Sequence, residues 1–125
     1  MAEERAAKQT ILIVEDDANT RQLLEQVFQE EGFTTVARSD LAAARSAIGE
    51  LGLPDIGLID FALPDGVGVD LCEDLRDRNV PCLIVSAYPT WLVDSVHPEP
   101  NWVSKPFDVE KLVKLVRQRL GEIAA

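Results

Sequence analysis

Residues 11–17 read Ile-Leu-Ile-Val-Glu-Asp-Asp, so that four apolar residues run directly into three acids. A short apolar run that ends abruptly at polar residues is typical of a strand buried on both faces of a sheet. Further short apolar runs occupy residues 33–37, 56–59, 83–85 and 102–103. We therefore expect five strands, the first of which ends at a cluster of acids.

Segments with helical spacing separate these runs. Apolar residues recur every three or four positions in residues 23–28, 41–51, 69–75 and 112–120. Gly32 follows the first segment as a C-cap, and Asp40 and Asp108 precede the second and the last as N-caps. Strands that alternate with helices predict one α/β domain, in which helices cover both faces of a parallel sheet and the crossovers are right-handed.

The composition is acidic, with 22 Asp and Glu against 12 Lys and Arg and a formal net charge of −10 over 125 residues. Nucleic acid and anionic membrane surfaces are bound mainly through Lys and Arg. We therefore expect neither a nucleic-acid partner nor a membrane partner. The length suits a single domain with one buried core.

Residues 1–9 contain no apolar stretch like that of a signal peptide, and no run approaches the roughly 18 apolar residues that a membrane span requires. We therefore expect a cytoplasmic protein. Cys72 and Cys82 lie in apolar segments and form no metal-ligand spacing with His97, so both are expected to be buried, reduced thiols. His97 lies in a polar, proline-containing loop and is expected to be exposed and not catalytic.

Chemically active side chains follow four of the five expected strands. They are Glu15, Asp16 and Asp17 after the first strand, Asp60 after the third, Ser86 after the fourth and Lys105 after the fifth. The carboxyl ends of parallel strands meet at one edge of the sheet, where ligands of open α/β sheets bind. Carboxylates gathered there repel one another, so they must share a proton or bind a cation.

Oxygen ligands of this kind suit Mg²⁺, which takes one or two protein carboxylates together with phosphate oxygens and waters. One carboxylate could then act as a nucleophile, with a lysine and a serine hydroxyl to stabilise the transferred group. Phosphoryl transfer depends mostly on positioning and on charge stabilisation, and these residues provide both.

Four segments together resemble the signatures of response-regulator receiver domains, in the family's order and approximate spacing. They are Ile11-Leu-Ile-Val-Glu-Asp-Asp17, Leu58-Ile-Asp-Phe-Ala-Leu-Pro-Asp-Gly66, Ile84-Val-Ser-Ala87 and Ser104-Lys-Pro-Phe107. The resemblance implies a flavodoxin-like (βα)5 fold with strand order 2-1-3-4-5 and with the first and last helices on one face. We expect an N-terminal tail at 1–9, a receiver domain at 10–122 and a C-terminal tail at 123–125.

The resemblance also implies roles for single residues. Asp60 would be the phosphoacceptor, and Mg²⁺ would be held by Asp16, by Glu15 directly or through water, by Asp60 and by the backbone carbonyl of Ala62. Ser86 would bond the phosphoryl group and draw its loop inward. Lys105 would pair first with the Asp60 carboxylate and then with the phosphate, and its bond to Pro106 could be cis.

Some of these residues also have structural interpretations. Asp17 is expected to cap the helix that follows, and Asp65 is assigned to the turn after the acceptor strand rather than to chemistry. Trp102 stands where the family usually places Tyr or Phe, a ring that swings inward with Ser86. It is either such a switch or an ordinary packing residue.

The segment between Ser86 and Lys105 departs from the family's pattern. It contains Pro89, Pro98 and Pro100, and a proline inside a helix costs roughly 3 kcal/mol. We therefore expect the fourth helix to be shortened or irregular, at best over residues 90–96.

The predicted function is a switch, not a metabolic enzyme. A sensor histidine kinase or a histidine phosphotransfer protein would phosphorylate Asp60, and binding to a downstream protein partner, whose identity the sequence leaves open, would change. The expected form is a monomeric, stand-alone receiver, although a receiver excised from a hybrid kinase would look similar.

Two rival classes, and a third with weaker support, are weighed against this function. A pseudo-receiver would keep the fold and signal without phosphorylation. An Asp-nucleophile phosphatase usually needs a second acid at the position of Ala62. A nucleotide-binding module would need a glycine-rich phosphate loop after a strand, which this chain lacks.

Overall fold

Five parallel strands form the main sheet of the computed structural model, which describes residues 8–87 and 102–121. In chain order they are β1 (Thr10–Val14), β2 (Thr34–Arg38), β3 (Ile56–Asp60), β6 (Cys82–Ser86) and β7 (Trp102–Ser104). Their spatial order is β2-β1-β3-β6-β7. The predicted order 2-1-3-4-5 is confirmed, because β6 and β7 are the fourth and fifth strands of this sheet.

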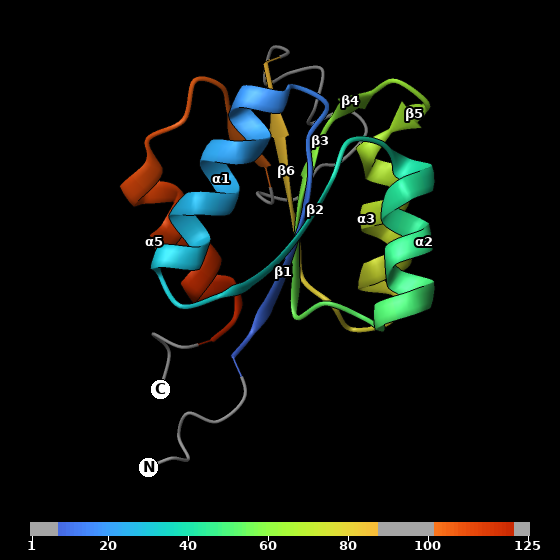
Figure 1. Cartoon of the computed structure of the whole chain (residues 1–125), viewed down its shortest axis with the longest axis horizontal. Helices are drawn as coiled ribbons and strands as arrows, with labels where there is room; N and C mark the ends of the chain where they lie inside the picture. Colours follow the sequence, from blue (N-terminus) through green and yellow to red (C-terminus); the bar gives the residue numbers. More distant parts are fainter. Residues whose placement is uncertain (1–7, 88–101, 122–125) are drawn as a thin grey trace.

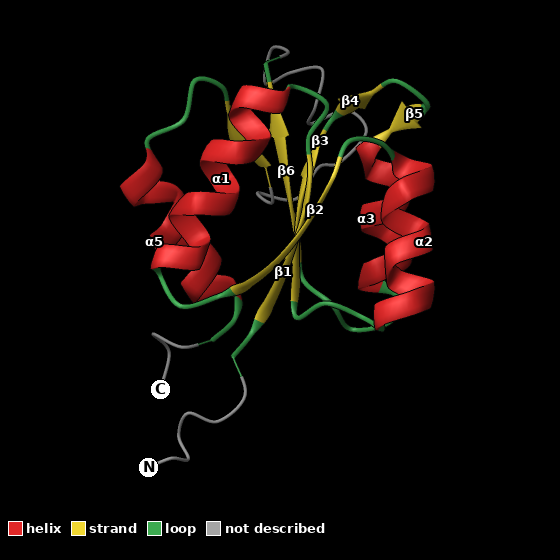
Figure 2. Cartoon of the chain, viewed as in Figure 1, coloured by secondary structure: helices red, strands yellow, loops and turns green. Residues whose placement is uncertain are grey.

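Two layers of helices cover the sheet, as Figures 1 and 2 show. Helices α1 (Ala18–Glu30) and α5 (Val109–Arg119) lie on one face, and α2 (Leu41–Leu51) and α3 (Gly68–Arg76) lie on the other. The prediction that the first and last helices share a face is therefore confirmed. The expected fourth helix falls within residues 88–101, outside the described residues.

The central strand β1 shows why both faces are covered. Ile11 and Ile13 pack in the cluster under α1 and α5, whereas Leu12 and Val14 pack in the cluster under α2 and α3. All four side chains are at most 1% exposed. Burial of such a side chain contributes about 1.5–3 kcal/mol, so the alternation along β1 stabilises both layers at once.

The ends of the helices follow the predicted caps. Asp17 accepts hydrogen bonds from the Thr20 N–H at 2.8 Å and the Thr20 hydroxyl at 2.7 Å. Asp40 and Asp108 cap α2 and α5 in the same way. Gly32, at φ +96°, follows α1 in a conformation that side chains rarely adopt. The caps therefore mark the starts of α1, α2 and α5.

A short antiparallel hairpin directly follows the third strand of the sheet. It pairs β4 (Ala62–Leu63) with β5 (Gly66–Val67), so Pro64 and Asp65 form its tip. The turn was predicted from the sequence, but the two-residue strands were not. The hairpin leads straight into α3 and therefore connects the end of β3 to the helical layer on that side.

Three remaining expectations concern burial and membrane association. Cys72 and Cys82 are buried free thiols, as predicted. No helix within residues 8–87 and 102–121 is long and apolar enough to cross a membrane. His97 lies outside the described residues.

Candidate functional site

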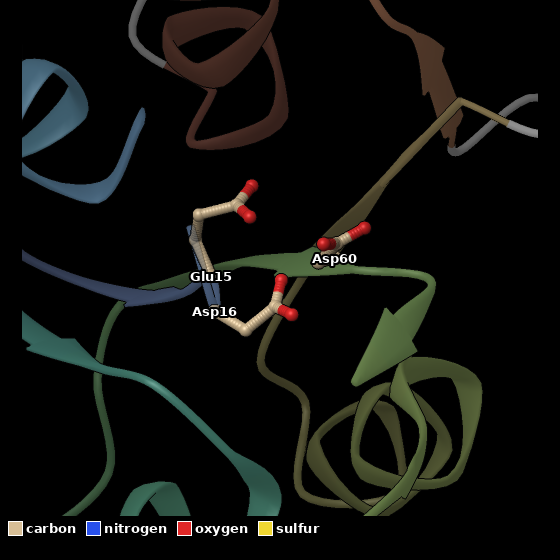
Figure 3. Close-up of side chains that lie close together, drawn as sticks. All are labelled: Glu15, Asp16 and Asp60. Carbon is tan, nitrogen blue, oxygen red and sulfur yellow. The ribbon is translucent and has the colours of Figure 1, made fainter. Parts of the chain in front are cut away.

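The carboxyl ends of β1 and β3 bring three carboxylates together. Glu15 and Asp16 follow β1, and Asp60 is the last residue of β3; Figure 3 shows the three side chains beside one another. One oxygen of each lies within 4.8 Å of one oxygen of each of the others. The main chain of Glu15 is held from both sides, because its N–H donates to the Arg38 carbonyl at 3.0 Å and its own carbonyl accepts from Nη1 of Arg21 at 2.9 Å.

The three acids differ in exposure. Glu15 is 2% exposed and Asp60 is 8% exposed, whereas Asp16 is exposed. Two carboxylates are thus removed from most of their water, and the third is the most accessible to solvent. The cluster is therefore open to solvent on the side of Asp16.

Lys105 contacts both buried acids. Its Nζ lies 2.8 Å from Oε1 of Glu15 and 3.4 Å from Oδ2 of Asp60. The Lys105 N–H also donates to the Ser86 carbonyl at 2.8 Å, and the Lys105–Pro106 peptide bond is cis. The family resemblance implies a pairing of Lys105 with Asp60; in the structure the ammonium group also contacts Glu15, and that contact is the shorter of the two.

The site gathers three carboxylates and one ammonium group, and this excess of acid shifts the pKa values of its members. Burial and the neighbouring Glu15 raise the pKa of Asp60 to about 6, although Lys105 opposes the shift. Burial lowers the pKa of Lys105, but the hydrogen bond to Glu15 and the charge of Asp60 outweigh it, so its pKa is raised overall. One ammonium group contacts a cluster of three carboxylates, so the donor set suits a divalent cation.

Ser86 and Ala62 are close to Asp60 in two different ways, the first through strand pairing and the second along the chain. Ser86 is 1% exposed at the end of β6, the strand that pairs with β3 on one side. Ala62 begins the hairpin, two residues after Asp60. Because the Gly68 N–H donates to the Phe61 carbonyl at 2.8 Å, Ala62 and Val67 form a non-hydrogen-bonded pair, which leaves the Ala62 carbonyl unused by the hairpin.

Trp102 begins β7, and its partly buried ring packs against the core cluster under α2 and α3. A ring packed in this way is compatible with both interpretations of Trp102, so its role as a switch stays a prediction.

Sequence reasoning missed two contacts near the site. Arg21 on α1 holds the Glu15 carbonyl, and Asp65 accepts hydrogen bonds from the first two N–H groups of α2. No local pattern marks Arg21. A turn acid such as Asp65 is ordinary in sequence, and its partners lie 23 and 24 residues away.

Comparison with known proteins places the chain among signalling domains. Residues 11–117 match the family model of the response regulator receiver domain. The DNA-binding response regulator MtrA of Mycolicibacterium paratuberculosis is 39% identical over 118 residues, which cover 90% of this chain and 52% of that protein. The sensory transduction protein RegX3 of Mycobacterium bovis is 32% identical over 112 residues, covering 86% and 49%.

Solved structures agree with the fold. A CheY-like receiver domain protein from Methanospirillum hungatei has a TM-score of 0.81 at 21% identity, covering 93% of this chain and 96% of the other. The receiver domain of the Erythrobacter litoralis response regulator PhyR has a TM-score of 0.80 at 27% identity, covering 93% and 92%.

These relatives correct one prediction. The acidic composition led us to expect no nucleic-acid partner, and that expectation is wrong, because MtrA is a DNA-binding response regulator. The chain spans about half the length of the curated relatives it matches. The charge of a receiver carries no information about the binding surface of a separate output region, which is why the inference failed.

The match to the family model covers most of the chain, and the similarity to MtrA extends over 90% of it. The strand order and the helical layers are those of the same fold. The chain therefore belongs to the response regulator receiver domain family of two-component signalling.

Proposed function

We propose that Asp60 accepts a phosphoryl group from a phosphohistidine of a sensor kinase or a histidine phosphotransfer protein, in a reaction that requires Mg²⁺. The observation that carries this proposal is the cluster of Glu15, Asp16 and Asp60 with Lys105 bridging two of its members. A structural ion pair would need one carboxylate for one ammonium group. The surplus of acid at a sheet edge is what a cation site requires.

The residues present fit Mg²⁺. Asp16, Glu15 and Asp60 would supply carboxylate oxygens, and the Ala62 carbonyl, which the hairpin leaves unused, would supply a fourth oxygen. When bound, Mg²⁺ neutralises part of the negative charge that the acids and the phosphoryl oxygens bring together.

Asp60 is suited to the role of nucleophile. With a pKa of about 6 it is mostly ionised at neutral pH. Its burial also removes hydrating water that would lower the nucleophilicity of the carboxylate. A carboxylate oxygen attacks phosphorus, the phosphorus–nitrogen bond of the donor breaks, and an aspartyl phosphate forms. The nitrogen leaves with the electron pair of that bond as the donor's imidazole.

Lys105 and Ser86 would stabilise the product. Lys105 already lies 3.4 Å from Asp60 and would pair with the phosphoryl oxygens, and the Ser86 hydroxyl would donate to one of them. Because the Lys105 N–H is bonded to the Ser86 carbonyl, movement of one residue would be passed to the other. That linkage would change the surface presented to a partner, with Trp102 as a further candidate for the moving group.

The relative MtrA is a DNA-binding response regulator, and the match covers only 52% of it, which supports an output region that binds DNA. We propose that phosphorylation of this receiver can control such an output region. The test is DNA binding by the complete gene product before and after phosphorylation. Equal binding in the two states would refute this part of the proposal.

The phosphorylation itself is tested with acetyl phosphate as donor. Wild type and Asp60→Asn are incubated with Mg²⁺ or with EDTA, and the phosphorylated fraction is followed on a phosphate-retarding gel. A band that requires both Mg²⁺ and Asp60 supports the proposal. If neither acetyl phosphate nor a phosphorylated sensor kinase produces that band, the pseudo-receiver alternative replaces it.

A further inference from the structure

The hairpin that follows Asp60 is tied at its tip to a different helix. The side chain of Asp65 accepts hydrogen bonds from the Leu41 N–H and the Ala42 N–H of α2, both at 2.9 Å. The tip also packs closely on α2, because a Cβ added at Gly66 would lie 2.9 Å from the Leu41 side chain. Two independent contacts therefore join the hairpin to α2.

These bonds complete the start of α2. The first four N–H groups of a helix have no partner within the helix. In α2, Asp65 takes the N–H groups of Leu41 and Ala42, and the Asp40 side chain takes that of Ala43 at 2.8 Å. The regular helical bonds then begin with the Ala44 N–H, which donates to the Asp40 carbonyl at 3.1 Å. Two carboxylates thus share this helix end, and of these two it is Asp65 that belongs to the hairpin beside the acceptor.

The base of the hairpin is equally constrained. Gly68 approaches the Asp60 carbonyl so closely that any side chain would overlap it, and the Gly68 N–H donates to the Phe61 carbonyl. The hairpin is thus held at its base by β3 and α3 and at its tip by α2. Ala62, whose carbonyl faces away from the hairpin ladder, lies between these two anchors.

We propose that Asp65 is a positioning residue for the metal site: by tying the hairpin tip to α2, it holds the Ala62 carbonyl where Mg²⁺ takes it as a ligand. This inference rests on the proposed function and adds a residue outside the acid cluster. Groups that orient metal ligands affect affinity without touching the ion. A free hairpin tip would have to be ordered again each time Mg²⁺ binds, which weakens binding.

The test is Mg²⁺ titration by calorimetry on wild type, Asp65→Ala and Asp40→Ala, each with its urea unfolding curve. Asp40→Ala is the matched control, because it removes a cap from the same helix end and leaves the hairpin contacts in place. We expect Asp65→Ala to weaken Mg²⁺ binding about tenfold, at the lower end of the range for groups that orient metal ligands. Asp40→Ala should bind Mg²⁺ within about twofold of wild type.

Asp65→Asn keeps one accepting oxygen and should fall between wild type and Asp65→Ala; it carries the test if the alanine variant does not fold. An equal loss of affinity in Asp40→Ala would overturn the inference, because the effect would then be general helix destabilisation. Wild-type affinity in both Asp65 variants would also overturn it. The two failures are distinguishable. If wild type itself did not bind Mg²⁺, the proposed function would be refuted together with this inference, whereas the outcomes above refute the inference alone.

Discussion

Asp60→Asn is predicted to stabilise the metal-free protein, and to do so more strongly as the pH rises. Asp60 has a folded-state pKa of about 6, raised by burial and by Glu15. A carboxyl group with a raised pKa binds its proton more tightly in the folded protein than in the unfolded chain. Binding of this proton therefore stabilises the folded protein. Its contribution to the free energy of unfolding is fully present below the unfolded pKa of 3.8 and is lost as the pH rises through about 6.

The size of this loss follows from the distance between the two pKa values. The folded value lies roughly two pH units above 3.8, and each unit corresponds to about 1.4 kcal/mol. Ionised Asp60 therefore lowers the free energy of unfolding by about 3 kcal/mol at about pH 8. Asparagine has nearly the shape of the protonated acid and cannot ionise, so the variant escapes this penalty.

The assay is urea unfolding of wild type and Asp60→Asn in EDTA, at about pH 4 and about pH 8. We expect nearly equal stability at the lower pH and a gain approaching 3 kcal/mol for the variant at the higher pH. Mg²⁺ at about a hundred times its dissociation constant should add roughly 2.7 kcal/mol to wild type. Because the variant has lost a ligand, Mg²⁺ should then close most of the gap.

Two results would refute this reasoning. One is a difference in stability between the variant and wild type that does not change with pH, which would mean that Asp60 has an ordinary pKa. The other is a variant less stable than wild type at about pH 8, which would mean that the contact with Lys105 outweighs burial and the repulsion by Glu15.

Three further predictions test the site and its support. Lys105→Met removes the opposing charge, so the pKa of Asp60 should rise further in an NMR titration and the rate of phosphorylation by acetyl phosphate should fall about a hundredfold; an unchanged rate would exclude Lys105 from the reaction. Glu15→Gln removes the repulsion and should lower the pKa of Asp60 in the same titration, whereas an unchanged or higher pKa would refute the contribution of Glu15 to the shift. Gly68→Ala should destabilise the fold by about 2 kcal/mol or more, because its Cβ would overlap the Asp60 carbonyl. Gly49→Ala, in an uncrowded position of α2, should stabilise it by about 0.5–1 kcal/mol in the same urea assay, and equal effects of the two substitutions would refute the steric argument.

The position of the acids and of Lys105 could be predicted from sequence because it depends on a general property of parallel sheets. Glu15, Asp60 and Ser86 end or follow strands whose carboxyl ends meet at one edge. Apolar runs mark the strands, and the caps Asp17, Asp40 and Asp108 mark the helix starts. Each of these signals is local in the sequence. Once the strands are assigned, the geometry of a parallel sheet brings the side chains at their ends together.

The contacts within the site could not be predicted in the same way. That Lys105 lies closer to Glu15 than to Asp60 depends on distances of 2.8 and 3.4 Å between groups 90 and 45 residues apart. The β4–β5 hairpin has strands of two residues, too short to show a period. Asp65 resembled an ordinary turn acid because its bonding partners belong to another helix.

The inference from charge failed for a different reason. A net charge of −10 describes the surface of this chain and says nothing of a region that a longer relative carries beyond it. Charge restricts the partners of a given surface, not those of a whole signalling protein.

The central claim is that Asp60 is the residue that takes the phosphoryl group, and peptide mapping tests it most directly. Wild type and Asp60→Asn are treated with acetyl phosphate and Mg²⁺, and their intact masses are measured by mass spectrometry. The acyl phosphate is then reduced with borohydride, and the reduced residue is located by peptide mapping. We predict one added phosphoryl group in wild type, a reduced side chain at position 60 and no addition in the variant. A mark on any other residue, or equal addition in the two proteins, would contradict the claim.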